Sequence, residues 1–122
     1  MEYLETTITV TEEQTAQSMG SGDLPVLATP AMIALMENAA MRYAANLIPE
    51  GCTTVGTQMQ VSHDRACGIG AVVTARATLI EKTDRVFTFQ VEAFDEKGPI
   101  GSGTHTRVSV LRDRFLAKLN QA

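Results

Sequence analysis

Apolar and polar residues alternate along much of the second half of the chain, as they do in half-buried β-strands. Between residues 55 and 63 the odd positions are mostly apolar, whereas positions 58, 60 and 62 are polar. Residues 71–81, 87–93 and 100–111 form further strand-like rows, separated by short polar turns. With a β-branched run at residues 5–10, the pattern predicts five strands, the last four joined largely by tight turns.

One long segment lacks this alternation and is typical of a helix. Thr29 is a good N-cap and Pro30 fits the first helical position, which predicts a helix from Thr29 to about Leu47. Its residues are apolar on nearly every face, so we expect the helix to be buried. A capping box at Thr11–Gln14 predicts a shorter helix before it.

This order of elements predicts the fold class. One strand, a short helix, a long apolar helix and four strands favour an α+β fold, with a five-stranded antiparallel sheet wrapped around one long central helix. Residues 112–119 are expected to form a short final helix. The 122 residues fit a single domain spanning 1–122. The open edges of such a sheet invite dimerisation.

Composition narrows the classes of partner. The net charge is −4 and no basic run occurs, which argues against nucleic acid. No apolar stretch is long enough to span a membrane, and residues 1–10 lack the basic start and apolar run of a signal peptide. We therefore expect a cytoplasmic protein whose Cys52 and Cys67 stay reduced. No Cys or His pair has metal-ligand spacing, so no metal site is expected.

Glu37 is the first candidate for chemistry because it lies within the apolar helix. A buried carboxylate must be paired, hydrogen-bonded or perturbed in its protonation, since an unpaired buried charge is costly. Glu37 is therefore a functional candidate. The alternative is a structural Glu satisfied by an Arg or by backbone donors, and the helix alone does not separate the two.

Other candidates lie on the predicted strands. His63 continues an apolar, core-facing row, where a hydrogen-bonded core His is more common than a catalyst. Gly56 marks either close approach of a ligand or a bulge, and Gly101–Gly103 has the same ambiguity. His105 and Arg107 share one side of the last strand, opposite its apolar Val positions; Arg107 is a ligand contact or a surface ion pair, and His105 is a second-tier candidate.

Six short motifs occur in order along the chain: Leu27–Ala31, Leu35–Ala39, Thr53–Thr57, Val61–His63, Val91–Asp95 and Ile100–Arg107. Together they resemble the fluoroacetyl-CoA thioesterase type of hotdog-fold protein, from about Val10 to Leu119. The resemblance implies a hotdog fold and hydrolysis of a small acyl-CoA thioester to a free acid and coenzyme A. We also expect a homodimer or dimer of dimers, and no cofactor.

The resemblance also implies roles for particular residues. The catalytic Thr, Glu and His of the family fall on Thr29, Glu37 and His63. The glycine that approaches the thioester falls on Gly56, and a ligand-contacting Arg, which could meet the polar part of coenzyme A, falls on Arg107. Residues 19–23 lack the aromatic-rich lid that belongs to fluoroacetate selectivity, so the resemblance implies thioester hydrolysis without the fluorinated substrate.

Several roles stay open at this point. Glu37 activates water or attacks the carbonyl, and His63 shuttles the proton or orients the carboxylate. Thr29 is first an N-cap, and second a nucleophile or a contact that holds the acyl group. Eight residues of helix separate Thr29 and Glu37 by ~12 Å, so either a loop lifts Thr29 or the site is completed across a dimer, which we favour.

Two other functions remain as alternatives. A non-catalytic dimer that binds acyl-CoA or another small apolar ligand has the same fold, since fold does not fix function. An acyl-CoA hydratase on this fold pairs an Asp with a downstream His on the helix. No His follows Glu37 on this helix, which counts against the hydratase.

Overall fold

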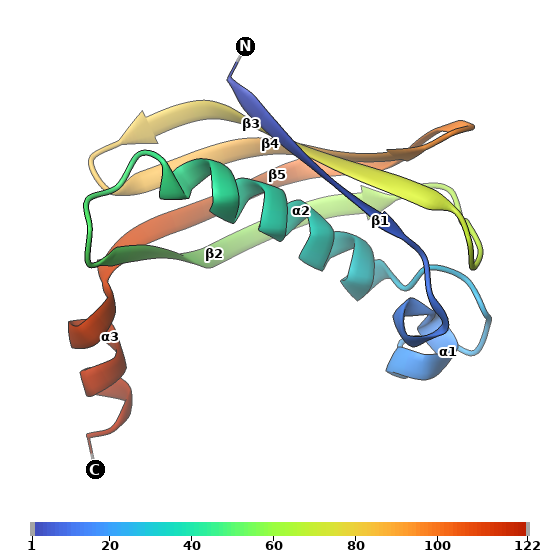
Figure 1. The fold of residues 1–122 in the computed structure, drawn as a ribbon, viewed down its shortest axis with the longest axis horizontal. Coiled ribbons are helices and arrows are strands. Elements are labelled where there is room, and N and C mark those ends of the chain that lie inside the picture. The colour runs from blue at the N-terminus through green and yellow to red at the C-terminus, as the bar shows by residue number, and fades with distance from the viewer. Residues whose placement is uncertain (1, 122) are drawn as a thin grey trace.

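The computed structural model describes residues 2–121 and has one antiparallel sheet that arches over a long helix (Figure 1). The strand order in the sheet is β1-β3-β4-β5-β2. The predicted five-stranded sheet around one helix is therefore confirmed. The elements are β1 (Tyr3–Thr9), the 3₁₀ turn η1 (Glu12–Gln14), α1 (Ala16–Met19), α2 (Thr29–Ala45), β2 (Cys52–His63), β3 (Val72–Thr83), β4 (Val86–Asp95), β5 (Gly98–Leu111) and α3 (Arg112–Leu119).

The connection after β2 is not a tight turn, unlike the two connections that follow it. β3, β4 and β5 are joined by tight turns and pair with one another, but β2 pairs with β5. Residues 64–71 therefore carry the chain across the sheet, from the β2 edge to β3, which pairs with β1. β1 and β2 form the two edges of the sheet.

The core lies between one face of α2 and the concave face of the sheet. Burying a Met or Phe side chain there contributes roughly 1.5–3 kcal/mol, and the small Ala residues let the helix approach the strands closely. We expected α2 to be buried on nearly every face. It is buried on one face only, and Ala34, Met41 and Ala45 are exposed. The buried face of α2 consists of Met32, Leu35, Met36, Ala39, Ala40 and Ala44.

The segment before α2 contains two short turns instead of one helix. The side chain of Gln14 accepts a hydrogen bond from the Thr11 backbone N–H at 2.9 Å, as the predicted capping box requires. However, η1 ends there, and Thr15 starts α1 by accepting from the Ser18 N–H at 3.2 Å. Gly20, with φ of 75°, then ends α1 because its left-handed backbone cannot continue the helix.

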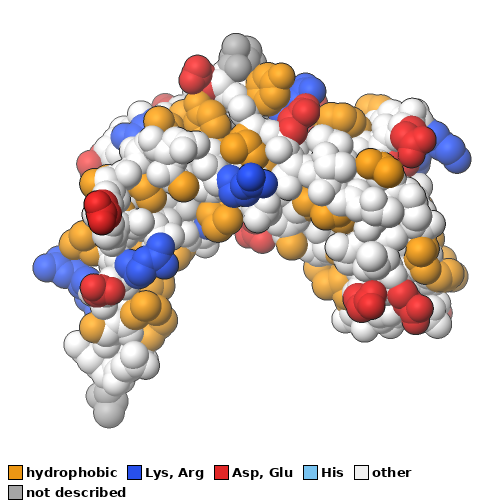
Figure 2. All heavy atoms as spheres, viewed as in Figure 1, with side chains coloured by type: hydrophobic (Ala, Val, Ile, Leu, Met, Phe, Trp, Pro, Cys, Tyr) orange, Lys and Arg blue, Asp and Glu red, His pale blue; other side chains and the backbone are white. Residues whose placement is uncertain are grey.

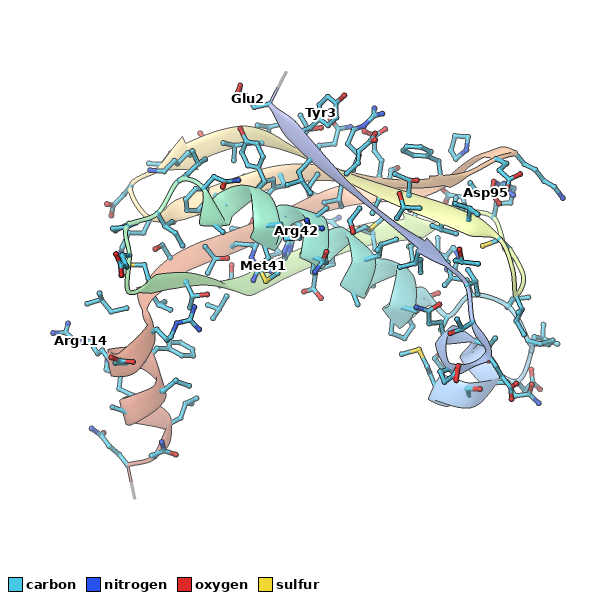
Figure 3. All side chains as sticks on the ribbon, in the orientation of Figure 1. Glu2, Tyr3, Met41, Arg42, Asp95 and Arg114 are labelled. Carbon is cyan, nitrogen blue, oxygen red and sulfur yellow. The ribbon has the colours of Figure 1, made fainter. Side chains whose placement is uncertain are left out.

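The molecule is hollowed on one side (Figure 2). α3 and the α1 region extend from the body as the two legs of an arch (Figure 1). Met41 and Arg42 project from α2 near the centre of this view (Figure 3). No helix among residues 2–121 has the length and apolar character needed to cross a membrane.

Candidate functional site

Two of the candidate side chains meet directly. Thr29 Oγ1 lies 2.7 Å from His63 Nδ1, a hydrogen bond between the start of α2 and the end of β2. The residues are 34 positions apart in the chain, so the fold creates this contact. A cavity of about 240 Å³ borders the pair; Leu27, Asp64 and Arg65 also line it.

Thr29 does not cap the helix, contrary to the sequence prediction. Ala28 is the N-cap, and its carbonyl accepts from the N–H groups of Ala31 and Met32, each at 3.0 Å. Its own N–H donates to the Gln14 carbonyl, which fixes this start one residue earlier than predicted. The Thr29 hydroxyl is therefore not engaged in capping and is directed to His63.

His63 has one ring nitrogen without a partner. Nδ1 contacts Thr29, whereas Nε2 is buried and makes no hydrogen bond among the described residues. An unsatisfied buried polar atom costs free energy, so Nε2 is available to a water, a substrate or a group of a second chain. His63 thus faces inward, as predicted. Its Nδ1 is hydrogen-bonded to Thr29, and its buried Nε2 is free to bind another group.

A bulge in β2 sets which of its residues face inward. The register against β5 shifts between Gly56 and Gln58. Because the bulge adds one residue, Thr54 and Gly56 face inward before it, and Met59 and His63 face inward after it. Placing Val55 and Thr57 in the inward row was therefore wrong.

Gly56 lies where three polar side chains converge. A Cβ at this position would lie 3.2 Å from Cε1 of His105, 3.3 Å from Oε2 of Glu37 and 3.5 Å from Nη1 of Arg107. The bulge reading of Gly56 is confirmed, since the register shift directly follows it, whereas the approach of a ligand stays a prediction. The missing side chain leaves room beside the Glu37 carboxylate.

Arg107 is buried, so the alternative of a surface ion pair was wrong. Its side chain is 7% exposed, and burial lowers its pKa, opposed by the nearby Glu37 charge. Nε donates to Thr54 Oγ1 at 2.8 Å, and Nη2 donates to the Thr54 carbonyl at 2.9 Å. Sequence reasoning missed Thr54, because only the β2–β5 register brings it to Arg107 and no local pattern marks it.

His105 lies beside Arg107 on the inward face of β5 and is only 1% exposed. Its Nδ1 is 2.8 Å from the Gln58 carbonyl, and its Nε2 is 3.2 Å from Nη1 of Arg107. Burial is the main cause that lowers the pKa of His105, so the ring stays neutral near neutral pH. The sequence correctly placed His105 and Arg107 on one side of the strand.

Glu37 forms no direct ion pair. Among residues 2–121 the ion pairs join Arg65 to Asp95 and Arg76 to Glu5. The half-buried Glu37 carboxylate thus lies beside the cation of Arg107 without pairing with it. This arrangement does not support the structural alternative of a Glu satisfied by an Arg.

The candidate residues therefore fall into two groups within one chain. Thr29 and His63 form the first, and Glu37, Gly56, His105 and Arg107 form the second. Thr29 and Glu37 are both in α2, separated along its axis by ~12 Å. A single chain does not bring Thr29 and Glu37 to one atom.

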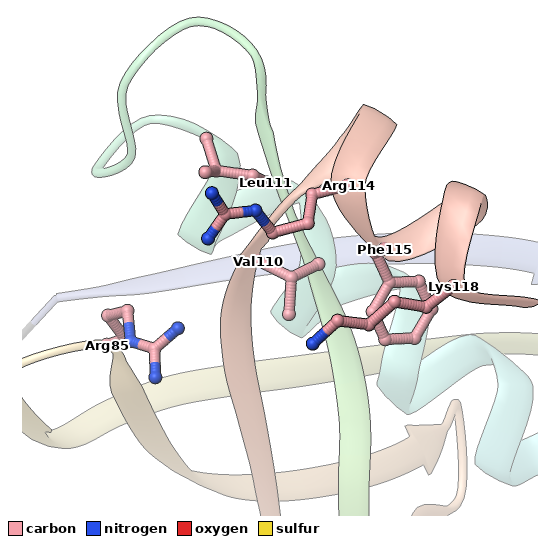
Figure 4. A pocket seen from close by; sticks show the side chains of 6 residues that line it. All are labelled: Arg85, Val110, Leu111, Arg114, Phe115 and Lys118. Carbon is pink, nitrogen blue, oxygen red and sulfur yellow. The ribbon is translucent and has the colours of Figure 1, made fainter.

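Another cavity, of about 190 Å³, lies beneath α3 at the end of β5 (Figure 4). It contains none of the residues predicted from the sequence, and its lining includes three basic side chains and one aromatic ring. It is therefore separate from the candidate site. Its lining consists of Arg85, Val110, Leu111, Arg114, Phe115 and Lys118.

Known proteins that resemble this chain point to one family. The family model of the fluoroacetyl-CoA-specific thioesterase matches residues 10–113. The chain belongs to this family. The fluoroacetyl-CoA thioesterase of Streptantibioticus cattleyicolor is 38% identical over 96 residues, which cover 79% of this chain and 69% of that protein.

Solved structures agree with this assignment and confirm the hotdog fold. A fluoroacetyl-CoA thioesterase structure superposes with a TM-score of 0.92 at 32% identity, covering 98% of this chain and 93% of that chain. A thioesterase superfamily member from Thermus thermophilus superposes with a TM-score of 0.88 at 25% identity, covering 96% and 87%. The structure of a mutant of the first enzyme in complex with acetyl-CoA superposes with a TM-score of 0.93 at 30% identity. The match covers 98% of this chain and 95% of that chain.

Proposed function

We propose that this chain hydrolyses acyl-CoA thioesters to a free acid and coenzyme A, with Thr29, Glu37 and His63 as catalytic residues. Membership of the thioesterase family supports the reaction class. The observation that carries the proposal is the 2.7 Å hydrogen bond between Thr29 and His63, the contact by which a base orients or activates a hydroxyl. Gly56 and Arg107 are the proposed substrate contacts.

The proposed chemistry assigns one task to each group. Glu37 accepts a proton from water as the water adds to the thioester carbonyl. The negative charge that develops on the carbonyl oxygen is stabilised by N–H donors, and the buried Arg107 guanidinium, which borders Gly56 together with Glu37, is one candidate. Thr29 holds the acyl group. As the C–S bond breaks, His63 passes the proton that Glu37 accepted from water to the sulfur of the departing coenzyme A thiolate, so both groups return to their starting states.

We propose that two chains complete this site as a homodimer. Thr29 and Glu37 lie too far apart along α2 to contact the same atom, and His63 Nε2 is buried without a partner among residues 2–121. α2 also leaves Ala34, Met41 and Ala45 exposed on the face away from the core. A second copy that covers this face could bring its own Glu37 to Thr29 and His63.

The edge strand β2 supports the same assembly. It is twelve residues long, contains no Asp, Glu, Lys or Arg, and leaves one edge of its backbone unpaired within the chain. Long edge strands without charges tend to pair with another strand. The other edge, β1, contains Glu5, which pairs with Arg76. We therefore place the subunit contact along β2.

Thr29 can be tested separately from its neighbours because it is not the N-cap. Thr29→Ser should retain most activity, whereas Thr29→Ala and Thr29→Asn should lower kcat/KM by at least about tenfold, since neither offers a hydroxyl to His63. All three should unfold within ~1 kcal/mol of the wild type, because no capping bond is lost. Steady-state rates and melting curves measure both. An Asn variant with full kcat/KM would remove Thr29 from the site.

Thiol release from a panel of acyl-CoAs, followed with Ellman's reagent, tests the function itself. We expect release from small acyl-CoAs with kcat/KM of about 10⁴ M⁻¹s⁻¹ or more. Because residues 19–23 contain no aromatic side chain, fluoroacetyl-CoA should be preferred over acetyl-CoA by less than about tenfold. Binding of acyl-CoA without thiol release would instead support a non-catalytic binding protein, and hydration of an enoyl-CoA would support the hydratase.

A further inference from the structure

The buried side chain of His105 takes no part in the proposed reaction, although it lies beside Arg107. Its two hydrogen bonds define its state. The Gln58 carbonyl only accepts, so the proton must be on Nδ1, and a guanidinium only donates, so Nε2 must carry a lone pair for Nη1 of Arg107. His105 is thus a neutral acceptor, fixed in one tautomer by its neighbours.

Arg107 is held along its full guanidinium plane. Thr54 fixes the Nε and Nη2 edge through two hydrogen bonds, and His105 fixes Nη1 through a third. Of the five N–H bonds of a guanidinium, this leaves about two free, one each on Nη1 and Nη2. Nη1 faces the space at Gly56, where Glu37 Oε2 also lies.

Without the bond to His105, Thr54 alone would hold the guanidinium, and the planar group could swing about its Nε and Nη2 edge until Nη1 reached the Glu37 carboxylate. A buried guanidinium next to a carboxylate gains strongly from a direct, charge-assisted hydrogen bond. Such a pair would occupy both the proposed base and the proposed donor before substrate binds. The described structure has no Glu37–Arg107 ion pair, although both groups border Gly56.

We propose that His105 is a positioning residue that holds Arg107 beside Glu37 without letting the two side chains pair. This inference rests on the proposed function, because it specifies what keeps both groups available to an acyl-CoA. His105 acts through the Nη1 atom of Arg107, to which it is hydrogen-bonded.

The surroundings of His105 keep it able to accept a hydrogen bond. Burial lowers its pKa most, the Gln58 carbonyl opposes this, the Arg107 charge lowers the pKa further, and Glu37 raises it. Gly56 and the Gln58 carbonyl of β2 lie against His105, and so does Phe89, its pairing partner in β4. None of these groups titrates. Because its pKa is lowered in the folded state, His105 is protonated more readily in the unfolded chain. The stability that depends on a neutral His105 is therefore complete above pH 6.5, its ordinary pKa, and is lost as the pH falls below it.

Two substitutions separate the two hydrogen bonds of the ring. In His105→Gln the amide oxygen can reach the place of Nε2 and accept from Arg107. In His105→Asn the shorter amide can still donate to the Gln58 carbonyl but cannot reach Arg107. Ser109→Ala is the matched control, because Ser109 is on the same inward row of β5, is 6% exposed and belongs to neither group of candidate residues.

The test compares rates, pH profiles and the imidazole NMR signals. We expect His105→Asn to lower kcat/KM about ten- to hundredfold and to move the acid limb of the pH–rate profile to lower pH, because direct pairing with Arg107 stabilises the Glu37 carboxylate. His105→Gln should recover most of the lost rate and keep the wild-type acid limb. Ser109→Ala should match the wild type in both.

The results distinguish this inference from the function on which it rests. In the wild type, ¹⁵N NMR should show a protonated Nδ1 and an unprotonated Nε2 on His105; the opposite tautomer would overturn the inference without reference to activity. An active wild type with an equally active, unshifted His105→Asn variant would also overturn it. A wild type that releases no thiol from any acyl-CoA would instead refute the proposed function.

Discussion

A Glu37→Gln variant is expected to lose thioester hydrolysis by ~10²- to 10⁴-fold in kcat, the usual effect of removing a general base. Gln has nearly the same shape but cannot take a proton from water. Its side chain fits the same half-buried place beside Gly56, so the fold should survive. Steady-state kinetics and a melting curve, measured on the same preparation, separate the two effects. A near-normal kcat accompanied only by a shifted Tm would make Glu37 a structural residue.

The same variant tests whether two chains share a site. Glu37→Gln chains and Thr29→Ala/His63→Ala chains should each be nearly inactive alone. If Thr29 and His63 of one chain work with Glu37 of its partner, each hybrid dimer contains one intact site, and random mixing should restore about a quarter of wild-type activity. Two affinity tags allow the hybrid to be purified. A hybrid as inactive as its parents would place the whole site within one chain.

Local patterns in the sequence were sufficient for most of the architecture. The hairpins β3–β4 and β4–β5 follow from alternation interrupted by turn residues, and α2 follows from its apolar pattern and the Pro near its start. Sequence signals locate the start of a helix only to within a residue or two. The sequence therefore predicted Thr29 as the N-cap, whereas the N-cap is Ala28. That small error concealed the main property of Thr29, a hydroxyl left free to contact His63.

The bulge in β2 could not be predicted from the alternation of apolar and polar residues. A period-two reading assumes an unbroken ladder, and one extra residue puts every position on its far side out of phase. Val55 and Thr57 were therefore assigned to the wrong face, and Thr54, the residue that holds Arg107, was missed. The only local sign was Gly56, a residue that is unusual within a strand.

The inward face of β5 is polar, which the amino-acid types along this strand did not predict. Val108 and Val110 suggested the buried face of this strand, yet the residues that point inward are His105, Arg107 and Ser109. Apolar residues indicate the core only where the facing layer is apolar. Here the facing residue of α2 is Glu37, so polar side chains from both layers meet. Their hydrogen bonds depend on the strand register, which no single strand encodes.

A Gly103→Ala variant is expected to show the largest loss of stability among these substitutions. A Cβ at Gly103 would overlap the Gln60 carbonyl oxygen and lie 2.6 Å from Cα of Val61, so β2 and β5 could not keep their present spacing. The glycines at 101 and 103 thus serve close strand packing. Overpacking of this kind costs about 2–3 kcal/mol, and Tm should fall by roughly 6–12 °C.

Gly68→Ala is the matched control for Gly103→Ala, because a Cβ at Gly68 would meet nothing within 4 Å and its backbone is not left-handed. Its Tm should stay near that of the wild type. Since β2 carries both Gly56 and His63, displacing it from β5 should also lower kcat/KM at temperatures well below the melting transition. Chemical denaturation and kinetics on both variants measure these effects. Equal stability of the two variants would mean that β2 can shift without cost, and that the β2–β5 register is not what holds the two halves of the site in place.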